Sequence, residues 1–139
     1  MIRNVYTVEA LYAIEHAAEI LNYDEPMPRP NERNIQKLEA CIERPFTVVA
    51  GRYQFWTLAH RAAVLFYTII KNHPLENGNK RSAVILTMLL LYVNGKTLKA
   101  SPDQVYKVAC MVAESPASQS ELQINLLKSA FKEFIVELM

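Results

Sequence analysis

Glycine and cysteine are scarce in this sequence, and neither sign of charge is in excess. Three glycines in 139 residues are too few for the many tight turns of an all-β fold, and a hydrophobic content of 51% excludes a disordered chain. Fifteen Lys and Arg residues against fourteen Asp and Glu residues give a net charge of +1. No general basic surface is therefore present to recruit nucleic acid or membrane lipid, and any recognition of an anion must be local.

The two cysteines have neither the CxxC spacing of redox sites nor the spacing of metal ligands. Cys41 and Cys110 lie in apolar surroundings, so we expect both to be reduced, buried and structural. The longest apolar run, residues 83–93, is shorter than the roughly 20 residues of a membrane span. Because glutamates at helical spacing interrupt the N-terminal segment, we do not expect it to be a leader sequence. We expect a cytoplasmic protein without membrane binding, in which residues 1–139 form a single domain.

Apolar residues recur at three- and four-residue steps through most of the chain, as in amphipathic helices. Asn31, Thr57 and Ser101 are good N-cap residues, and Gly95 suits the position that follows a helix end. The sequence thus predicts an all-α fold, a compact helical bundle. The helices are expected at about residues 7–22, 32–43, 58–71, 79–94, 102–113 and 120–137.

One segment departs from the helical pattern. Residues 46–58 are the only stretch enriched in β-branched and aromatic residues, and the pair Ala50–Gly51 lies in its middle. This arrangement predicts a short β-hairpin near residues 46–57 that leans on the helices, because two strands alone are barely stable.

The loop HPLENGNKR, residues 73–81, places cations where the most apolar helix should begin. The first turn of a helix favours acidic side chains, and a cation there costs roughly 0.3–1 kcal/mol. A phosphate bound by the free N–H groups would instead make Lys80 and Arg81 favourable. Gly78 allows close backbone approach, and His73 could take a proton from an attacking hydroxyl. From these residues alone, a solvated helix cap with a structural histidine is the alternative.

These residues closely resemble the signature of the Fic/Doc family, HPFx[D/E]GN[G/K]R. His73, Pro74 and the run from Gly78 to Arg81 are in register with it. The resemblance implies a Fic-like helical fold whose members transfer part of a nucleotide, usually ATP, to a hydroxyl of a protein. It implies that His73 is the general base, that Asn79 helps to form an anion hole, and that Lys80 and Arg81 bind phosphates and offset charge in the transition state.

Two positions favour the Doc, or death-on-curing, branch of the family. Lys80 stands where AMP-transferring members have glycine, and Val84 stands where they have a second arginine. Doc-like members are understood to transfer phosphate. The resemblance therefore implies a toxin that is neutralised by an antitoxin in trans. By family analogy, we expect its target to be a protein of the translation machinery. Transfer of AMP and a non-catalytic nucleotide- or peptide-binding role are the alternatives.

Two departures from the signature affect packing and metal binding. Leu75 replaces the usual phenylalanine, at a position where a similar apolar volume suffices. Asn77 replaces the acid that binds Mg²⁺ in the family, and an amide oxygen brings no charge to the ion. We therefore expect the nucleotide-binding loop to include Asn77 and Gly78 but its metal site to be weak. By the same resemblance, the hairpin is expected to be a flap that holds an extended target segment by strand addition, through Val48, Val49, Ala50, Gly51, Arg52 and Tyr53.

Overall fold

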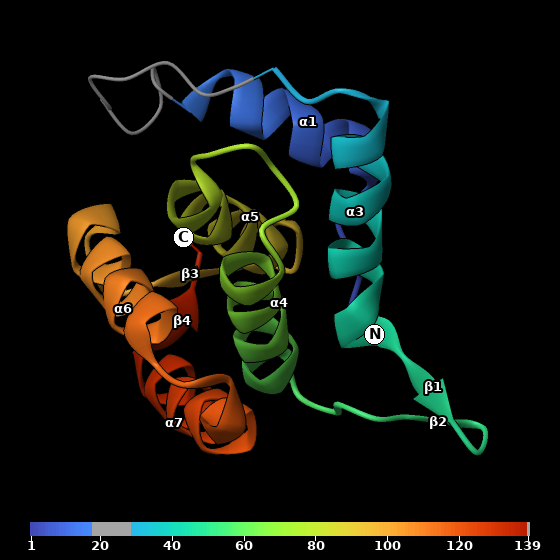
Figure 1. Cartoon of the computed structure of the whole chain (residues 1–139). Helices are drawn as coiled ribbons and strands as arrows, with labels where there is room; N and C mark the ends of the chain where they lie inside the picture. Colours follow the sequence, from blue (N-terminus) through green and yellow to red (C-terminus); the bar gives the residue numbers. More distant parts are fainter. Residues whose placement is uncertain (18–28, 139) are drawn as a thin grey trace.

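The computed structural model describes residues 1–17 and 29–138, which are mainly helical, as predicted. Helix α4 (Leu58–Asn72) lies in the middle, between α3 on one side and the pair α6 and α7 on the other (Figure 1). Helix α1 lies across one end of α3, and α5 packs against α4. The remaining helical elements are α1 (Thr7–Glu15), α3 (Glu32–Glu43), η1 (Arg44–Phe46), α5 (Asn79–Val93), α6 (Pro102–Glu114), η2 (Ala117–Gln119) and α7 (Ser120–Phe134).

The helix starts lie where the capping residues predicted them. The Asn34 N–H donates to Asn31 Oδ1 (2.8 Å) at the start of α3, and the His60 N–H donates to Thr57 Oγ1 (3.1 Å) at the start of α4. Ser101 caps α6 in the same way. These side chains satisfy N–H groups that the helix itself leaves unpaired, which is why local sequence located them. Residues 18–22 of the first predicted helix lie outside the described part of the chain.

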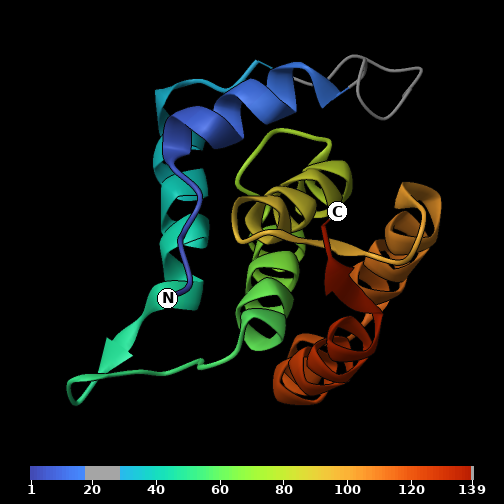
Figure 2. The same cartoon turned by 180° about the vertical axis from the view of Figure 1, so that it is seen from behind.

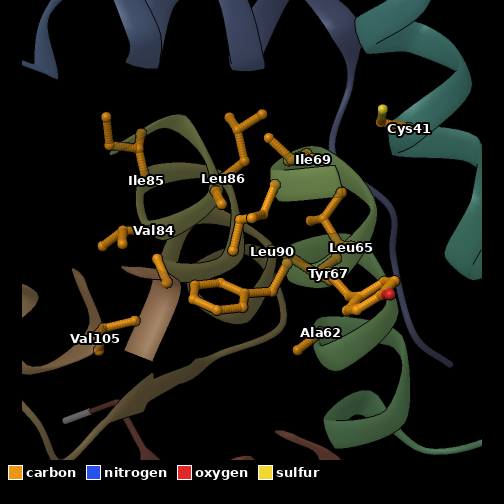
Figure 3. Packing of buried hydrophobic residues seen from close by; sticks show 14 of the residues in the cluster. Cys41, Ala62, Leu65, Tyr67, Ile69, Val84, Ile85, Leu86, Leu90 and Val105 are labelled. Atoms are coloured by element: carbon orange, nitrogen blue, oxygen red, sulfur yellow. The ribbon is translucent and has the colours of Figure 1, made fainter. Parts of the chain in front are cut away.

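The hydrophobic core is built on α4 and α5. Every side chain from Arg61 to Ile70 on α4 is buried, and Phe66 meets Phe131 of α7 edge to face with 5.5 Å between ring centroids. Figure 3 shows Leu86 and Leu90 of α5 packed towards Leu65 and Ile69 of α4. None of the described helices combines the length and hydrophobicity that crossing a bilayer requires.

The two cysteines differ in burial. Cys41 is buried, as expected, but the prediction that Cys110 is buried was wrong, because it is partly exposed. Cys110 is on α6, whose buried stripe consists of Val105, Ala109 and Val112. Position 110 lies about 100° around the helix from position 109 and therefore outside that stripe.

The predicted hairpin is confirmed. Strand β1 (Val48–Val49) pairs with β2 (Arg52–Tyr53) in antiparallel register, with Val49 opposite Arg52. Ala50 and Gly51 form the turn with φ values of 51° and 77°. Positive φ at both central residues is what a two-residue hairpin turn of matching twist requires.

A second pair of strands was not predicted. The last helix was expected to reach Glu137, but it ends at Phe134, and β4 (Ile135–Glu137) pairs antiparallel with β3 (Lys96–Leu98). The hairpin is therefore not the only β-structure, and Figure 2 shows this second pair between α5 and α7. Pairing with a strand some 40 residues away supplies backbone hydrogen bonds that a helical pattern does not reveal.

Candidate functional site

The loop that connects α4 to α5 carries the motif residues, and two of its residues have left-handed backbone conformations. His73 follows the last residue of α4 with φ 47° and ψ 61°, and Gly78 precedes α5 with φ 73°. Glycine adopts this conformation at little cost, but a residue with a Cβ loses roughly 1–2 kcal/mol. Such strain persists only where neighbouring contacts impose it, and it is concentrated at functional sites.

The Asn79 side chain holds this loop closed from within. The Leu75 N–H donates to Asn79 Oδ1 (3.0 Å), and Asn79 Nδ2 donates to the Leu75 carbonyl (3.1 Å). Asn79 is 7% exposed and Leu75 is 4% exposed. Leu75 thus packs in the core, as expected of the residue that replaces phenylalanine. The motif asparagine therefore has a structural role that its predicted place in an anion hole did not include.

Contacts from distant elements hold the two ends of the loop. Asn34 Nδ2, on α3, donates to the carbonyl of Pro74 (3.0 Å), and Asn34 is buried. Lys71 Nζ, in the last turn of α4, donates to the carbonyls of Ala113 (3.3 Å) and Ser115 at the end of α6. Sequence reasoning missed both residues. The capping box that Asn34 forms with Asn31 was a local signal of its importance, but nothing in the sequence pointed to Pro74.

A shallow pocket of about 200 Å³ lies against this loop. Its size is below the roughly 300–1,000 Å³ of pockets that enclose a whole small ligand. It can hold phosphate groups, whereas the rest of a nucleotide would extend over the adjoining surface. The residues that line it are Ile70, His73, Glu76, Asn77, Gly78, Asn79, Lys80 and Ala113.

The N-terminus of α5 faces this pocket without a side-chain cap. The first turn of α5 contains no acidic residue, and its first intrahelical bond runs from the Ser82 N–H to the Gly78 carbonyl (2.9 Å). Among the described residues, the N–H groups of Asn79 and Lys80 have no hydrogen-bond acceptor. Oriented N–H groups and the positive end of a helix dipole favour an anion, and the Lys80 side chain adds a full charge.

Arg81 lies on the same turn but is placed differently from Lys80. Its side chain is partly buried and takes part in an interaction of its own. It is not among the described residues that line the pocket. The structure therefore brings His73, Asn77, Gly78, Asn79 and Lys80 together, and the predicted phosphate contact of Arg81 stays a prediction.

The His73 ring is exposed at the edge of the pocket. Its Nδ1 lies 3.5 Å from Asn79 Nδ2, whose amide is already oriented by the backbone of Leu75. A contact of this length is too weak to hold the imidazole in one tautomer. Either ring nitrogen can therefore present its lone pair to an incoming hydroxyl.

The oxygen donors for a metal ion are few. Glu76 and Asn77 line the pocket, both exposed, and supply one carboxylate and one amide oxygen. Across residues 1–17 and 29–138, no group of three or more His, Cys, Asp or Glu side chains is arranged to hold a metal ion. Such a donor set suits Mg²⁺ only where water and the phosphates of a nucleotide complete its coordination.

The hairpin lies at the opposite end of α4 from the loop. Figures 1 and 2 both show β1 and β2 joined to the start of α4, whereas His73 follows its last residue. The 15 residues of α4 span about 22 Å. The predicted docking of a target segment on the hairpin stays a prediction, but such a segment would have to extend along α4 before a hydroxyl could reach His73.

Comparison with known proteins places the loop in a family. The sequence model of the Fic/DOC family matches residues 6–91, which include all of α4 and the whole loop. A curated relative, Toxin Doc of Mycolicibacterium smegmatis, is 35% identical over 71 residues, which cover 51% of this chain and 55% of the relative. The chain thus spans about half the length of this relative, and no solved structure matches it significantly. Because the family model covers more than half of the sequence, this chain belongs to the Fic/DOC family.

Proposed function

We propose that this protein transfers the terminal phosphate of ATP to a hydroxyl group of another protein. The observation that carries the proposal is the pocket at the start of α5, where His73, Lys80 and unpaired helix N–H groups meet. A cation in the first turn of a helix is unfavourable unless an anion is bound, and phosphate is an anion that such helix ends bind. Membership in a family of transferases supports a reaction at this site.

The residues of the pocket have distinct roles in the proposed reaction. The imidazole of His73 takes the proton of the acceptor hydroxyl, whose oxygen then bonds to the γ-phosphorus of ATP. The bond between that phosphorus and the bridging oxygen to the β-phosphate breaks, and ADP leaves. The N–H groups of Asn79 and Lys80 and the Lys80 ammonium group offset the charge that develops on the phosphoryl oxygens. Arg81 is proposed to bind a second phosphate.

Mg²⁺ fits this site as a companion of the nucleotide rather than as a resident ion. Glu76 and Asn77 are the residues that would contact it, and it would neutralise phosphate charge.

Asn77→Asp adds a carboxylate at the position where the family has one. We expect the variant to bind ATP more tightly when Mg²⁺ is present and to gain little without it, as measured by calorimetry. An equal affinity with and without Mg²⁺ would assign the metal contact to Glu76 or to no residue.

The biological role that we propose is that of a toxin. The relative from Mycolicibacterium smegmatis is named Toxin Doc, which supports this role. On the resemblance to the Doc branch we further propose that the protein acts in the cytoplasm on a protein of the translation machinery. A small antitoxin acting in trans would neutralise the protein. Expression of the chain alone should then arrest growth, and the His73→Ala variant should not.

The test of the chemistry uses ATP labelled at either the α- or the γ-phosphate, incubated with the protein and a cell extract. Protein labelled only from the γ position supports phosphate transfer, and label from the α position shows AMP transfer. His73→Ala should lower labelling by about 10²–10⁴-fold, the usual contribution of a general base. His16→Ala is the matched control, since this histidine lies at the end of α1 and stacks on Tyr12. Full labelling by His73→Ala would refute the catalytic assignment and favour a binding role.

Lys80→Gly separates phosphate transfer from AMP transfer. It removes a charge-assisted contact worth about 1.5–3 kcal/mol, so transfer from the γ position should fall at least tenfold. Val84 supplies no second arginine, and we therefore expect little gain of transfer from the α position. Wild-type protein that labels from the α position, with no change in Lys80→Gly, would establish AMP transfer instead.

A further inference from the structure

A second pocket lies at the base of the hairpin and contains a buried cation. This pocket, of about 350 Å³, is lined by Gly51, Arg52, Tyr53, Trp56 and Arg61. Arg61 lies in the first turns of α4 and is only 4% exposed, whereas Arg52 is exposed. The two guanidinium groups therefore face the same space from different elements, one fixed in the helix and the other on β2.

A backbone carbonyl and two aromatic rings hold the Arg61 guanidinium in place. Its Nε–H donates to the carbonyl of Phe55 (2.9 Å), and its central carbon lies over the rings of Phe46 (4.6 Å) and Tyr53 (4.4 Å). Among the described residues, no acidic side chain forms an ion pair with it, and the four N–H groups on its two terminal nitrogens have no acceptor.

Within residues 1–17 and 29–138, no carboxylate is paired with the charge of Arg61. Burial lowers the pKa of Arg61, but an arginine keeps its charge at neutral pH. The terminal nitrogens of Arg61 are not enclosed and open onto the pocket, where an acid can reach them. A mostly buried cation favours an acidic partner, because desolvation strengthens the attraction between the two charges. Between Glu43 and Glu76 the sequence contains Arg52, Arg61 and two other cations, and no acidic residue at all. The sequence around Arg61 therefore contains no acidic residue that could pair with its guanidinium group.

The family resemblance already implies that an extended segment docks on the hairpin; we propose that this pocket, in addition, selects an acidic side chain of the docked partner protein. The carboxylate bonds to the free N–H groups of Arg61 and to Arg52, in the bidentate geometry that guanidinium groups favour. Tyr53 and Trp56 are half to two-thirds exposed beside it, and Val48 and Val49 are exposed on β1. Arginine and aromatic side chains together are typical of protein interfaces, and a free phosphate would leave this apolar surface unused.

The proposed interface is separate from the transfer site. Arg61 and His73 are twelve positions apart on α4, about 18 Å along its axis. A residue in an extended segment advances about 3.3 Å. If the acidic residue of a partner is bound at Arg61, the residue whose hydroxyl reaches His73 must therefore lie about five or six positions away from that acid in the partner's sequence. Binding here does not depend on the proposed phosphate transfer and can be measured without ATP.

Trp56 is the only tryptophan in the sequence and lines the pocket, so its fluorescence reports directly on binding. The probes are the blocked peptide acetyl-Thr-Val-Glu-Val-Thr-amide, the same peptide with Gln in place of Glu, and sodium phosphate. Each is titrated into the full chain and followed by Trp56 fluorescence and by the NMR signal of the Arg61 Nε–H group. The Glu peptide should bind saturably and at least tenfold more tightly than the Gln peptide, and phosphate should not compete at equal concentration.

Two variants test the assignment to these arginines. Arg52→Gln changes an exposed side chain and leaves the ring contacts of Arg61 in place. It should lower the affinity for the Glu peptide at least fivefold and leave the affinity for the Gln peptide unchanged. Arg61→Gln should abolish the preference for Glu, with circular dichroism used to confirm that the helices remain folded. Equal binding of the two peptides, no binding of the Glu peptide at millimolar concentration, or equally effective competition by phosphate would each overturn the proposal. ATP-dependent labelling by the same samples reports on the transfer site independently.

Discussion

Replacement of Asn79 by alanine tests whether this side chain closes the functional loop. Two hydrogen bonds between its amide and the backbone of Leu75, at 3.0 and 3.1 Å, are lost together. Each such bond contributes about 0.5–1.5 kcal/mol net, and the buried polar groups of Leu75 are left unpaired. We expect Asn79→Ala to lower the free energy of unfolding by about 2–3 kcal/mol, which most domains survive.

Urea denaturation measures this loss, and hydrogen exchange locates it. The Leu75 amide donates to Asn79 Oδ1, so it should exchange much faster in Asn79→Ala than in the wild type. Asn79→Asp keeps that acceptor but places a buried carboxylate oxygen against the Leu75 carbonyl, to which the amide had donated. The Asp variant should therefore retain protection of the Leu75 amide, although it loses at least the roughly 1 kcal/mol of the missing bond.

Asn77→Ala is the matched control, because Asn77 is an exposed residue of the same loop whose amide has no hydrogen-bond partner among the described residues. Its effect on stability should stay within about 0.5 kcal/mol. A Leu75 amide that remains protected in Asn79→Ala, with stability equal to that of the Asn77→Ala variant, would refute the assignment. Asn79 would then be available for the anion-binding role that its place in the motif suggests.

Three further changes test the described geometry. Ala50→Gly should raise the free energy of unfolding by about 0.5–1 kcal/mol, because the φ of Ala50 is 51°. Gly51→Ala should lower it by about 1 kcal/mol because of the positive φ, although there is open space for a Cβ at that position. Changes of the opposite sign in urea denaturation would contradict the turn. Burial raises the pKa of Cys41 to about 11. Iodoacetamide at about pH 8 should therefore alkylate Cys110 and leave Cys41 unmodified until urea is added, as measured by peptide mass spectrometry. Equal labelling of the two cysteines in the native protein would contradict the burial of Cys41. Burial, with a smaller contribution from Lys128, lowers the pKa of His60 below its ordinary value of 6.5, so the unfolded chain takes up the proton first as the pH falls. Stability should therefore decrease as the pH falls from 6.5 to the folded pKa, and His60→Gln should remove this part of the dependence; an unchanged pH profile in that variant would show that His60 does not contribute.

The sequence by itself determined most of the helices, the hairpin and the residues that make up the loop. Capping by Asn31, Thr57 and Ser101 acts over three residues, so these helix starts could be found locally. The motif from His73 to Arg81 indicated the family and most of the residues that line the pocket, because the chain between α4 and α5 is too short to place them far apart. Local reasoning also singled out Gly78, which has a positive φ of 73°.

Tertiary structure decided the contacts between segments that are far apart in the sequence. The bond from Asn34 to the Pro74 carbonyl spans 40 positions, and the pairing of β3 with β4 spans a similar interval. The local sequence of each segment does not predict the other, because these hydrogen bonds depend on how the helices pack. The position of the hairpin is the clearest case. Local propensity predicted its strands and turn. The length and direction of α4, however, place it about 18–22 Å from His73 and next to the buried charge of Arg61.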